Sequence, residues 1–156
     1  MSFKIDYSIK QIPNSSLVYR SDDYSFDVRP TPEGGFTSAL FDDLNLELNA
    51  TGRVVSVWGL CPHTRWKSAD LMPPEADFGA AFFVSDSPLV RGVSVQLNKD
   101  KYRPVFVDKA SGWVHVTGSD DAVSSVKVLT GVILEIDGRR NLCGIWLKPN
   151  ELPKLG

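Results

Sequence analysis

The chain has 156 residues, a mass of 17.2 kDa and 42% hydrophobic residues, which predict one soluble domain over residues 1–156 with a core of its own. A formal net charge of −2 and a pI of about 5.6 argue against nucleic acid and anionic membranes as partners, because proteins that bind them usually carry a basic patch. No apolar run approaches the roughly 18 to 20 residues of a membrane-spanning helix, and the first ten residues lack the apolar block of a secretion signal. We therefore expect a cytoplasmic protein.

Hydrophobic residues recur with a period of two along most of the chain, which is typical of half-buried β-strands. The first such run starts at Phe3. Runs over 44–48 and 54–60 flank the turn sequence Asn-Ala-Thr-Gly and predict a hairpin. A second hairpin is expected from 132–136 and 142–147.

Three further runs, at 93–97, 105–107 and 113–116, are separated by short polar turns at 98–101 and 108–112, and they predict a three-stranded meander. Helical patterns are scarce, since ten prolines and twelve glycines are spread along the chain. The best candidates for a helical turn are Ser119–Ser125 and Ser68–Leu71. These patterns predict an all-β or β-rich fold, an antiparallel sandwich or barrel of hairpins with at most short helices.

An internal repeat is suggested by the two hairpins. Residues 46–58 (LELNATGRVVSVW) align without a gap over 134–146 (LEIDGRRNLCGIW), with Leu, Glu and the final Trp in common. One interpretation is that any two amphipathic hairpins with polar turns look alike, because a hairpin imposes few constraints. The other is a fold with two related halves, which would place Trp58 and Trp146 at equivalent positions.

The alternation also predicts which side chains form the core. Trp58, Trp113 and Trp146 lie in predicted strands and are expected in the core, whereas Trp66 lies in a loop between basic residues and is expected to be exposed. Six aliphatic residues on the apolar phase of the hairpins are predicted to be buried: Leu46, Leu48, Val57, Leu134, Ile136 and Ile145.

The densest group of reactive side chains is the segment Cys61-Pro62-His63-Thr64-Arg65-Trp66. A cysteine nucleophile needs a base and a third group that orients the base, and this segment supplies no third group. Cys61 and Cys143 are therefore expected to be reduced thiols that pack as small hydrophobes. The spacing typical of structural zinc is absent, so we expect neither a metal nor a cofactor.

Acidic residues are concentrated in the first third of the chain. Residues 1–52 contain four Lys/Arg and eight Asp/Glu, whereas residues 53–104 contain seven and five. Such a face can steer a basic partner toward the protein, or it can be ordinary solvated surface that keeps the protein soluble. The residues predicted to bind a partner are Asp42, Asp43, Glu47, His63, Arg65 and Trp66.

With this profile and the Asp-Gly-Arg hairpin LEIDGRRNLCGIW, the chain resembles the small bacterial immunity proteins that neutralise toxins delivered between competing cells. The resemblance covers general character and one hairpin, and it transfers no functional residues. It implies a cytosolic inhibitor that masks the active site of a toxin, often with acidic residues against a basic nuclease cleft.

The function expected from the sequence is thus non-catalytic binding of a protein partner, with a basic toxin as the candidate. One alternative is a carbohydrate-binding sandwich that uses Trp66 and Trp113 as stacking platforms beside fixed polar groups. Another is a small enzyme centred on Cys61 and His63, which would show an unusually acidic, reactive thiol. The oligomeric state cannot be deduced from these patterns.

Overall fold

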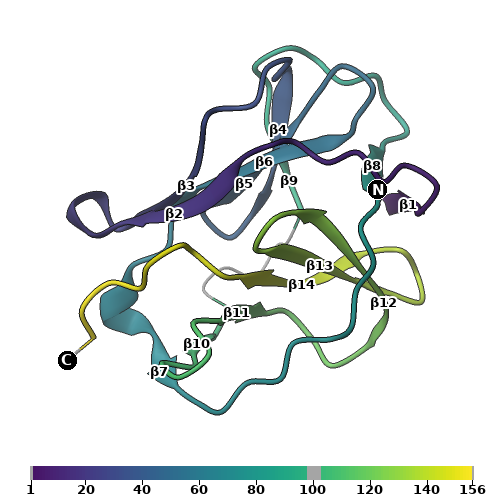
Figure 1. Ribbon diagram of the computed structural model, residues 1–156. Coiled ribbons are helices and arrows are strands. Elements are labelled where there is room, and N and C mark those ends of the chain that lie inside the picture. The colour runs from purple at the N-terminus through teal and green to yellow at the C-terminus, as the bar shows by residue number, and fades with distance from the viewer. Residues whose placement is uncertain (1, 98–102, 156) are drawn as a thin grey trace.

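The computed structural model describes residues 2–97 and 103–155, and Figure 1 shows its course. Strands dominate, as the alternating pattern predicts. They are β1 (Ser2–Asp6), β2 (Ser16–Arg20), β3 (Ser25–Arg29), β4 (Thr37–Phe41), β5 (Leu44–Leu48), β6 (Val54–Leu60), β7 (Lys67–Ser68), β8 (Ala80–Val84), β9 (Val95–Gln96), β10 (Val105–Val107), β11 (Val114–Thr117), β12 (Ala122–Leu129), β13 (Val132–Asp137) and β14 (Leu142–Leu147). Two short 3-10 helices, η1 (Ser21–Asp23) and η2 (His63–Arg65), complete the described elements.

Two sheets face each other as a sandwich (Figure 1). The first sheet has the order β2-β3-β6-β5-β4-β9 and the second has the order β12-β13-β14-β11-β10-β7. Over the described residues neither sheet closes on itself, which favours the sandwich over the barrel. A small antiparallel sheet of β1 and β8 lies beside them. In the described part of the chain, no helix is long and apolar enough to cross a membrane.

The two sheets repeat one topology. The first half, β2 to β6, has the spatial order 2-3-6-5-4, and the second half, β10 to β14, has the order 10-11-14-13-12. Each strand of the first half therefore has a counterpart whose strand number is higher by eight, so that β2 corresponds to β10 and β6 to β14. Within each half all neighbouring strands are antiparallel. This confirms two related halves.

The repeat extends to the pairing of single residues. Leu46 lies opposite Val57, and Leu134 lies opposite Ile145, so adding 88 to each residue number converts the first pair into the second. Both hairpins carry an irregularity at the same place, after Glu47 and after Glu135. A β-bulge is a specific, positioned feature of a strand pair, so its recurrence at equivalent residues argues against a chance likeness of two hairpins.

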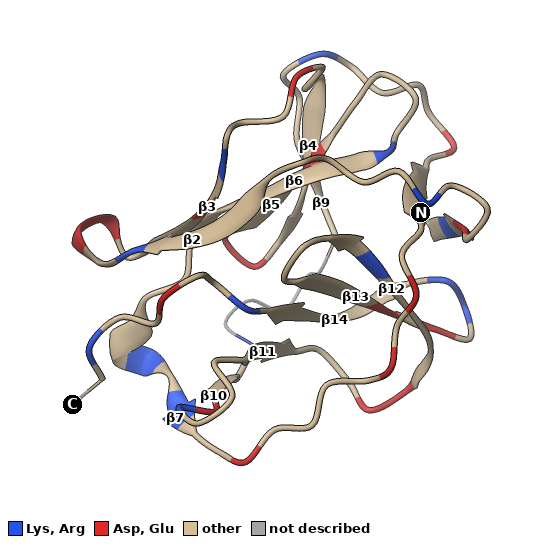
Figure 2. Cartoon of the chain, viewed as in Figure 1, with Lys and Arg blue, Asp and Glu red and all other residues tan. Residues whose placement is uncertain are grey.

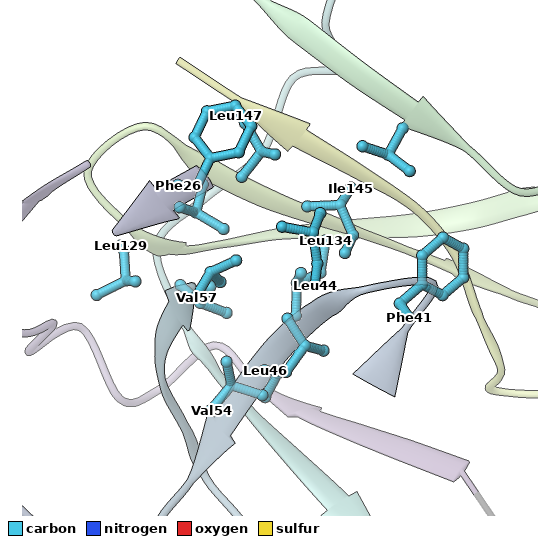
Figure 3. Packing of buried hydrophobic residues seen from close by; sticks show 14 of the residues in the cluster. Phe26, Phe41, Leu44, Leu46, Val54, Val57, Leu129, Leu134, Ile145 and Leu147 are labelled. Atoms are coloured by element: carbon cyan, nitrogen blue, oxygen red, sulfur yellow. The ribbon is translucent and has the colours of Figure 1, made fainter. Parts of the chain in front are cut away.

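The core lies between the sheets, where side chains from both halves converge (Figure 3). All six aliphatic residues predicted to be buried are at most 2% exposed, which confirms the apolar phase of both hairpins. The largest buried side chains come from both halves and include Phe26, Phe41, Leu17, Leu44, Leu46, Leu48, Leu129, Leu134, Ile145 and Leu147. Burying a side chain of this kind contributes roughly 1.5 to 3 kcal/mol, so the core is the main source of stability.

Several local predictions are wrong or lie outside the described residues. Residues 119–125 form no helical turn, because β12 starts at Ala122 and pairs with β13. The segment 68–71 is not helical either, since β7 runs beside β10. The expected meander is only partly present: β10 and β11 pair, but β9 joins the first sheet beside β4. The turn predicted at 98–101 lies outside the described residues.

An extended segment, Ala69–Gly79, connects β7 to β8 and runs along the outer side of the second sheet (Figure 1). We call it the strap. Near β10, the N–H of Leu71 donates to Asp108 Oδ2 at 3.1 Å. Near β12, the Ser125 hydroxyl donates to the Glu75 carbonyl at 3.0 Å. Because Ser125 lies opposite Glu135, on the phase that faces away from the core, the strap crosses the outer face from one edge region to the other.

Candidate functional site

The residues predicted to bind a partner do not gather in one place. Asp42, Asp43 and Arg65 line a cleft of about 280 Å³ between the sheets, together with residues of β6, β10 and β11. His63 and Trp66 line a separate hollow beside the C-terminal segment. Glu47 lies on the outer face of the first sheet. The set therefore divides among three surfaces.

Asp42 has a structural task at the turn between β4 and β5. Its backbone has a φ of 54°, in the left-handed region that Asp tolerates better than most residues. Its Oδ2 accepts the backbone N–H of Arg103 at 2.8 Å, which ties this turn to the segment just before β10. The neighbouring Asp43 is exposed. Of the two adjacent carboxylates, Asp43 is the better candidate for contact with a partner.

Tyr19 organises the segment that contains Cys61 and His63. Its hydroxyl donates to the Cys61 carbonyl at 2.8 Å and accepts the His63 backbone N–H at 2.9 Å. The Cys61 side chain is 6% exposed, and burial raises the pKa of its thiol to about 12. A thiol with such a pKa is almost entirely protonated at neutral pH, which disfavours the enzyme alternative centred on Cys61 and His63.

Trp66 is half-buried, so the prediction of an exposed ring is wrong. The turn of η2 brings its ring into a stack with Phe26, with centroids 5.8 Å apart, and into an edge contact with Tyr19 at 4.9 Å. Aromatic pairs of this geometry stabilise a fold beyond their buried area. Trp66 is thus part of the packing below η2. Trp113 is also half-buried and meets Trp146 edge-on.

Trp58 is the exposed tryptophan, with 43% of its surface accessible, so the prediction that it is in the core is wrong. It follows the buried Val57 in β6, and successive residues of a strand point to opposite faces. Strict alternation through Val57 would have placed Trp58 outside. The apolar composition of the run concealed this signal.

Trp58 lies in a hollow of about 500 Å³ on the outer face of the first sheet. We call it the Trp58 hollow. It is lined by residues of β2, η1, β3, β4, β5 and β6 and by the turn before β5: Arg20, Asp23, Ser25, Phe26, Asp27, Leu40, Asp43, Asn45, Trp58, Gly59 and Leu60. Leu60 adds a second apolar group, 53% exposed.

The polar groups beside Trp58 hold its strand and ring in place. The indole Nε1–H donates to Glu47 Oε2 at 3.0 Å, and the Asn45 amide donates to the Trp58 carbonyl at 3.3 Å. Asn45 Oδ1 also accepts the Ser38 hydroxyl at 3.1 Å. Because these bonds fix the ring before any partner arrives, little conformational entropy remains to be lost on binding.

Carboxylates outnumber cations around the hollow. Its lining includes Asp23, Asp27 and Asp43 but a single cation, Arg20, which pairs with Asp23 at 3.1 Å. Arg29 reaches Asp27 at 2.9 Å from the end of β3. Figure 2 shows acidic residues at the turn between β2 and β3 and at the turn before β5. The acidic residues of the first third of the chain therefore include three that lie together at the Trp58 hollow.

The counterpart of Trp58 is covered. Trp146 occupies the position 88 residues later. It lies on the outer phase of β14, the strand that pairs with β13, and is only 5% exposed. Its ring stacks on His115, with centroids 3.9 Å apart. His115 Nε2 lies 2.7 Å from Glu135 Oε1. The same position is thus internal in one half and open in the other.

Searches for relatives do not add to the geometry. No protein-family model matches the chain, and no curated protein matches it in sequence. Within residues 2–97 and 103–155, no three His, Cys, Asp or Glu side chains gather in a way that could hold a metal ion.

Proposed function

We propose that this chain is a non-catalytic binding protein and that a basic protein partner docks on the Trp58 hollow. The observation that supports this most is the exposure of Trp58, 43% against 5% for its counterpart Trp146. A fixed, exposed tryptophan beside charged groups is the composition of an interface hot spot. The exposed carboxylate of Asp43 adds attraction for lysine and arginine side chains, whereas Asp27 is paired with Arg29.

In line with the resemblance to immunity proteins, we propose that the basic partner is a toxin. An acidic surface that covers a basic nuclease cleft would inhibit a toxin without any chemistry of its own. The compact fold and the buried thiol of Cys61 are compatible with such a passive inhibitor. A cytoplasmic location remains part of the same proposal.

The carbohydrate alternative receives less support from the hollow. A sugar site needs polar groups with fixed geometry beside the aromatic platform, available for sugar hydroxyls. Here the Glu47 carboxylate is engaged by the Trp58 ring, and the Asn45 amide is engaged by Ser38 and by backbone. The platforms first expected, Trp66 and Trp113, are half-buried.

The test compares capture and binding by three purified proteins: the wild type, Trp58→Ala and Val123→Ala. Val123 is 71% exposed on β12 of the other half and serves as the matched control for loss of an exposed apolar side chain. We expect a basic protein that binds the wild type and Val123→Ala equally. Trp58→Ala should weaken binding by at least about 30-fold, the effect of a hot spot of about 2 kcal/mol.

A second variant tests the electrostatic part. Asp43→Lys should slow association at low salt, and the difference should shrink as added salt shortens the Debye length below about 10 Å. Asp43 is preferable to Asp42 or Glu47, because the last two make structural hydrogen bonds. A partner that binds Trp58→Ala and Asp43→Lys as well as wild type overturns the proposal. Glycan binding that depends on Trp58 would overturn it in favour of the carbohydrate alternative.

A further inference from the structure

The strap of the second half provides a template for how an outer face of this fold is covered. It is held at both ends by backbone and side-chain hydrogen bonds: the N–H of Ala69 donates to the Val107 carbonyl at 3.0 Å, and the N–H of Lys127 donates to the Asp77 carbonyl at 2.9 Å. These ends lie beside β10 and β12, which β13, β14 and β11 separate within the sheet. Ile133, which lies on the outer phase of β13, is only 2% exposed.

The path of the strap can be transferred to the first half by the offset of 88 residues. The strap begins its path along the second sheet beside Asp108, and the residue at the equivalent position of the first half is Arg20. It crosses the face that contains Trp146, whose counterpart is Trp58. Both Arg20 and Trp58 line the Trp58 hollow.

The other end of the path transfers in the same way. Ile133 on β13 corresponds to Asn45 on β5. Lys127 lies opposite Ile133 as Leu40 lies opposite Asn45, so the two correspond by pairing, although their numbers differ by 87 because the register of β12 shifts between Lys127 and Leu129. Asn45 and Leu40 also line the hollow. The hollow on the first half therefore follows the route that the strap takes on the second half.

We infer that the Trp58 hollow binds an extended segment of a basic protein partner, which crosses the first sheet along the route that the strap follows on the second sheet. This inference rests on the proposed function and specifies its docking mode. Neighbouring strands are about 4.8 Å apart, so a crossing from β2 to β4 covers about 19 Å. An extended chain advances at most about 3.6 Å per residue, so at least about six residues are required.

The charge of the hollow selects the chemistry of the segment. The strap carries Asp70, Glu75 and Asp77 and no Lys or Arg, so it is mismatched to a hollow lined by Asp23, Asp27 and Asp43 and by one cation, Arg20. The strap of a second copy is therefore disfavoured by like-charge repulsion. A segment with lysine or arginine is favoured. Proline suits it as well, because extended proline-containing segments dock in aromatic-lined grooves.

The test is a selection of random dodecapeptides displayed on phage against the immobilised wild-type protein, with depletion on Trp58→Ala. Selected peptides are then synthesised and titrated against wild type, Trp58→Ala, Asp43→Lys and Val123→Ala. We expect enrichment of peptides that contain Lys or Arg with Pro. Their affinity should fall at least about 10-fold for Trp58→Ala and Asp43→Lys and stay within about twofold for Val123→Ala.

Several results would overturn the inference: no enrichment, enrichment of acidic peptides, or peptides that bind Trp58→Ala as tightly as wild type. A dimer that disappears in Trp58→Ala, measured by analytical ultracentrifugation, would place a second copy in the hollow and overturn it too. Failure of the proposed function is recognised separately. If an intact basic partner requires Trp58 while overlapping peptides of its sequence do not bind, the function stands and the extended docking mode is wrong.

Discussion

The two halves of the molecule share a strand order and a residue register, yet their outer faces differ. The strap crosses the second half, whereas the corresponding route on the first half is an open hollow around Trp58. Trp58 and Trp146 occupy equivalent positions and are 43% and 5% exposed. The Trp146 ring packs against His115 and Trp113, whereas Trp58 borders an open hollow, so equivalent positions of the two hairpins differ in exposure.

The side chains at equivalent positions fit this difference. Position 45 is Asn on the open face, and its counterpart at 133 is Ile on the covered face. The equivalent glutamates also differ in partner: Glu47 accepts the Trp58 indole N–H, whereas Glu135 contacts His115. At position 133 an apolar side chain thus replaces the polar one of position 45 and is buried.

The largest expected effect tests the part that both halves share. Leu134→Ala and Leu46→Ala each remove a fully buried side chain at equivalent positions. We expect each to lower the free energy of unfolding by about 2 to 5 kcal/mol, measured by urea denaturation. A loss below about 1 kcal/mol in one of them would show that the two cores are not equivalent.

The second prediction contrasts the two tryptophans. Trp146→Ala should lower the free energy of unfolding by about 3 to 5 kcal/mol, because it empties a covered site. Trp58→Ala should cost about 1 kcal/mol or less, because much of its ring is already in water. Urea unfolding, monitored by circular dichroism, measures both free energies of unfolding. Equal decreases in the two variants would contradict the assignment of one open and one covered face.

The equivalent glutamates give a smaller contrast. Glu135→Ala leaves His115 without its carboxylate in a half-buried site, and we expect a loss of about 1 to 3 kcal/mol. Glu47→Ala removes one hydrogen bond to an exposed ring and should cost about 0.5 to 1.5 kcal/mol. Comparing thermal and urea midpoints of the two variants measures the difference. The reverse order would mean that the strap does not shield the pair at His115.

The smallest effect at neutral pH concerns the thiols. Burial raises the pKa of Cys61 to about 12 and that of Cys143 to about 11. A raised folded-state pKa gives stability that is fully present below the unfolded value near 9 and is lost as the pH rises through the folded value. We therefore expect alkylation of the native protein at pH 8 to be slow at both thiols and slower at Cys61. Rapid labelling of Cys61 before unfolding would contradict its buried state.

Much of the fold follows from the sequence because alternation reports directly on which side of a strand meets the core. Alternation correctly predicts the six core residues and both hairpins. Alternation does not report what covers the other side of a sheet, so the outward Trp146 could not be distinguished from the outward Trp58. The strap has no periodic signal of its own.

The candidate site was harder to predict, because its residues come from five strands and two turns. The acidic first third indicated the correct region, but Asp42 and Glu47 have structural partners that only the folded chain reveals. The basic neighbours of Trp66 predict exposure to solvent, but its ring turns back onto Phe26. A loop residue can reach the core whenever its turn directs it there.

The shared register has a consequence for assembly during folding. Two sets of strands with the same pairing pattern can exchange partners, a known route to misassembled repeats and swapped oligomers. One pair of facing residues opposes this exchange: Phe26 on β3 lies opposite Gly59 on β6, whereas Val114 on β11 lies opposite Leu147 on β14. An exchanged sheet would set Phe26 against Leu147, which crowds the interior, and Val114 against Gly59, which leaves a void. The different sizes of the facing residues at this position therefore disfavour an exchange of strands between the halves.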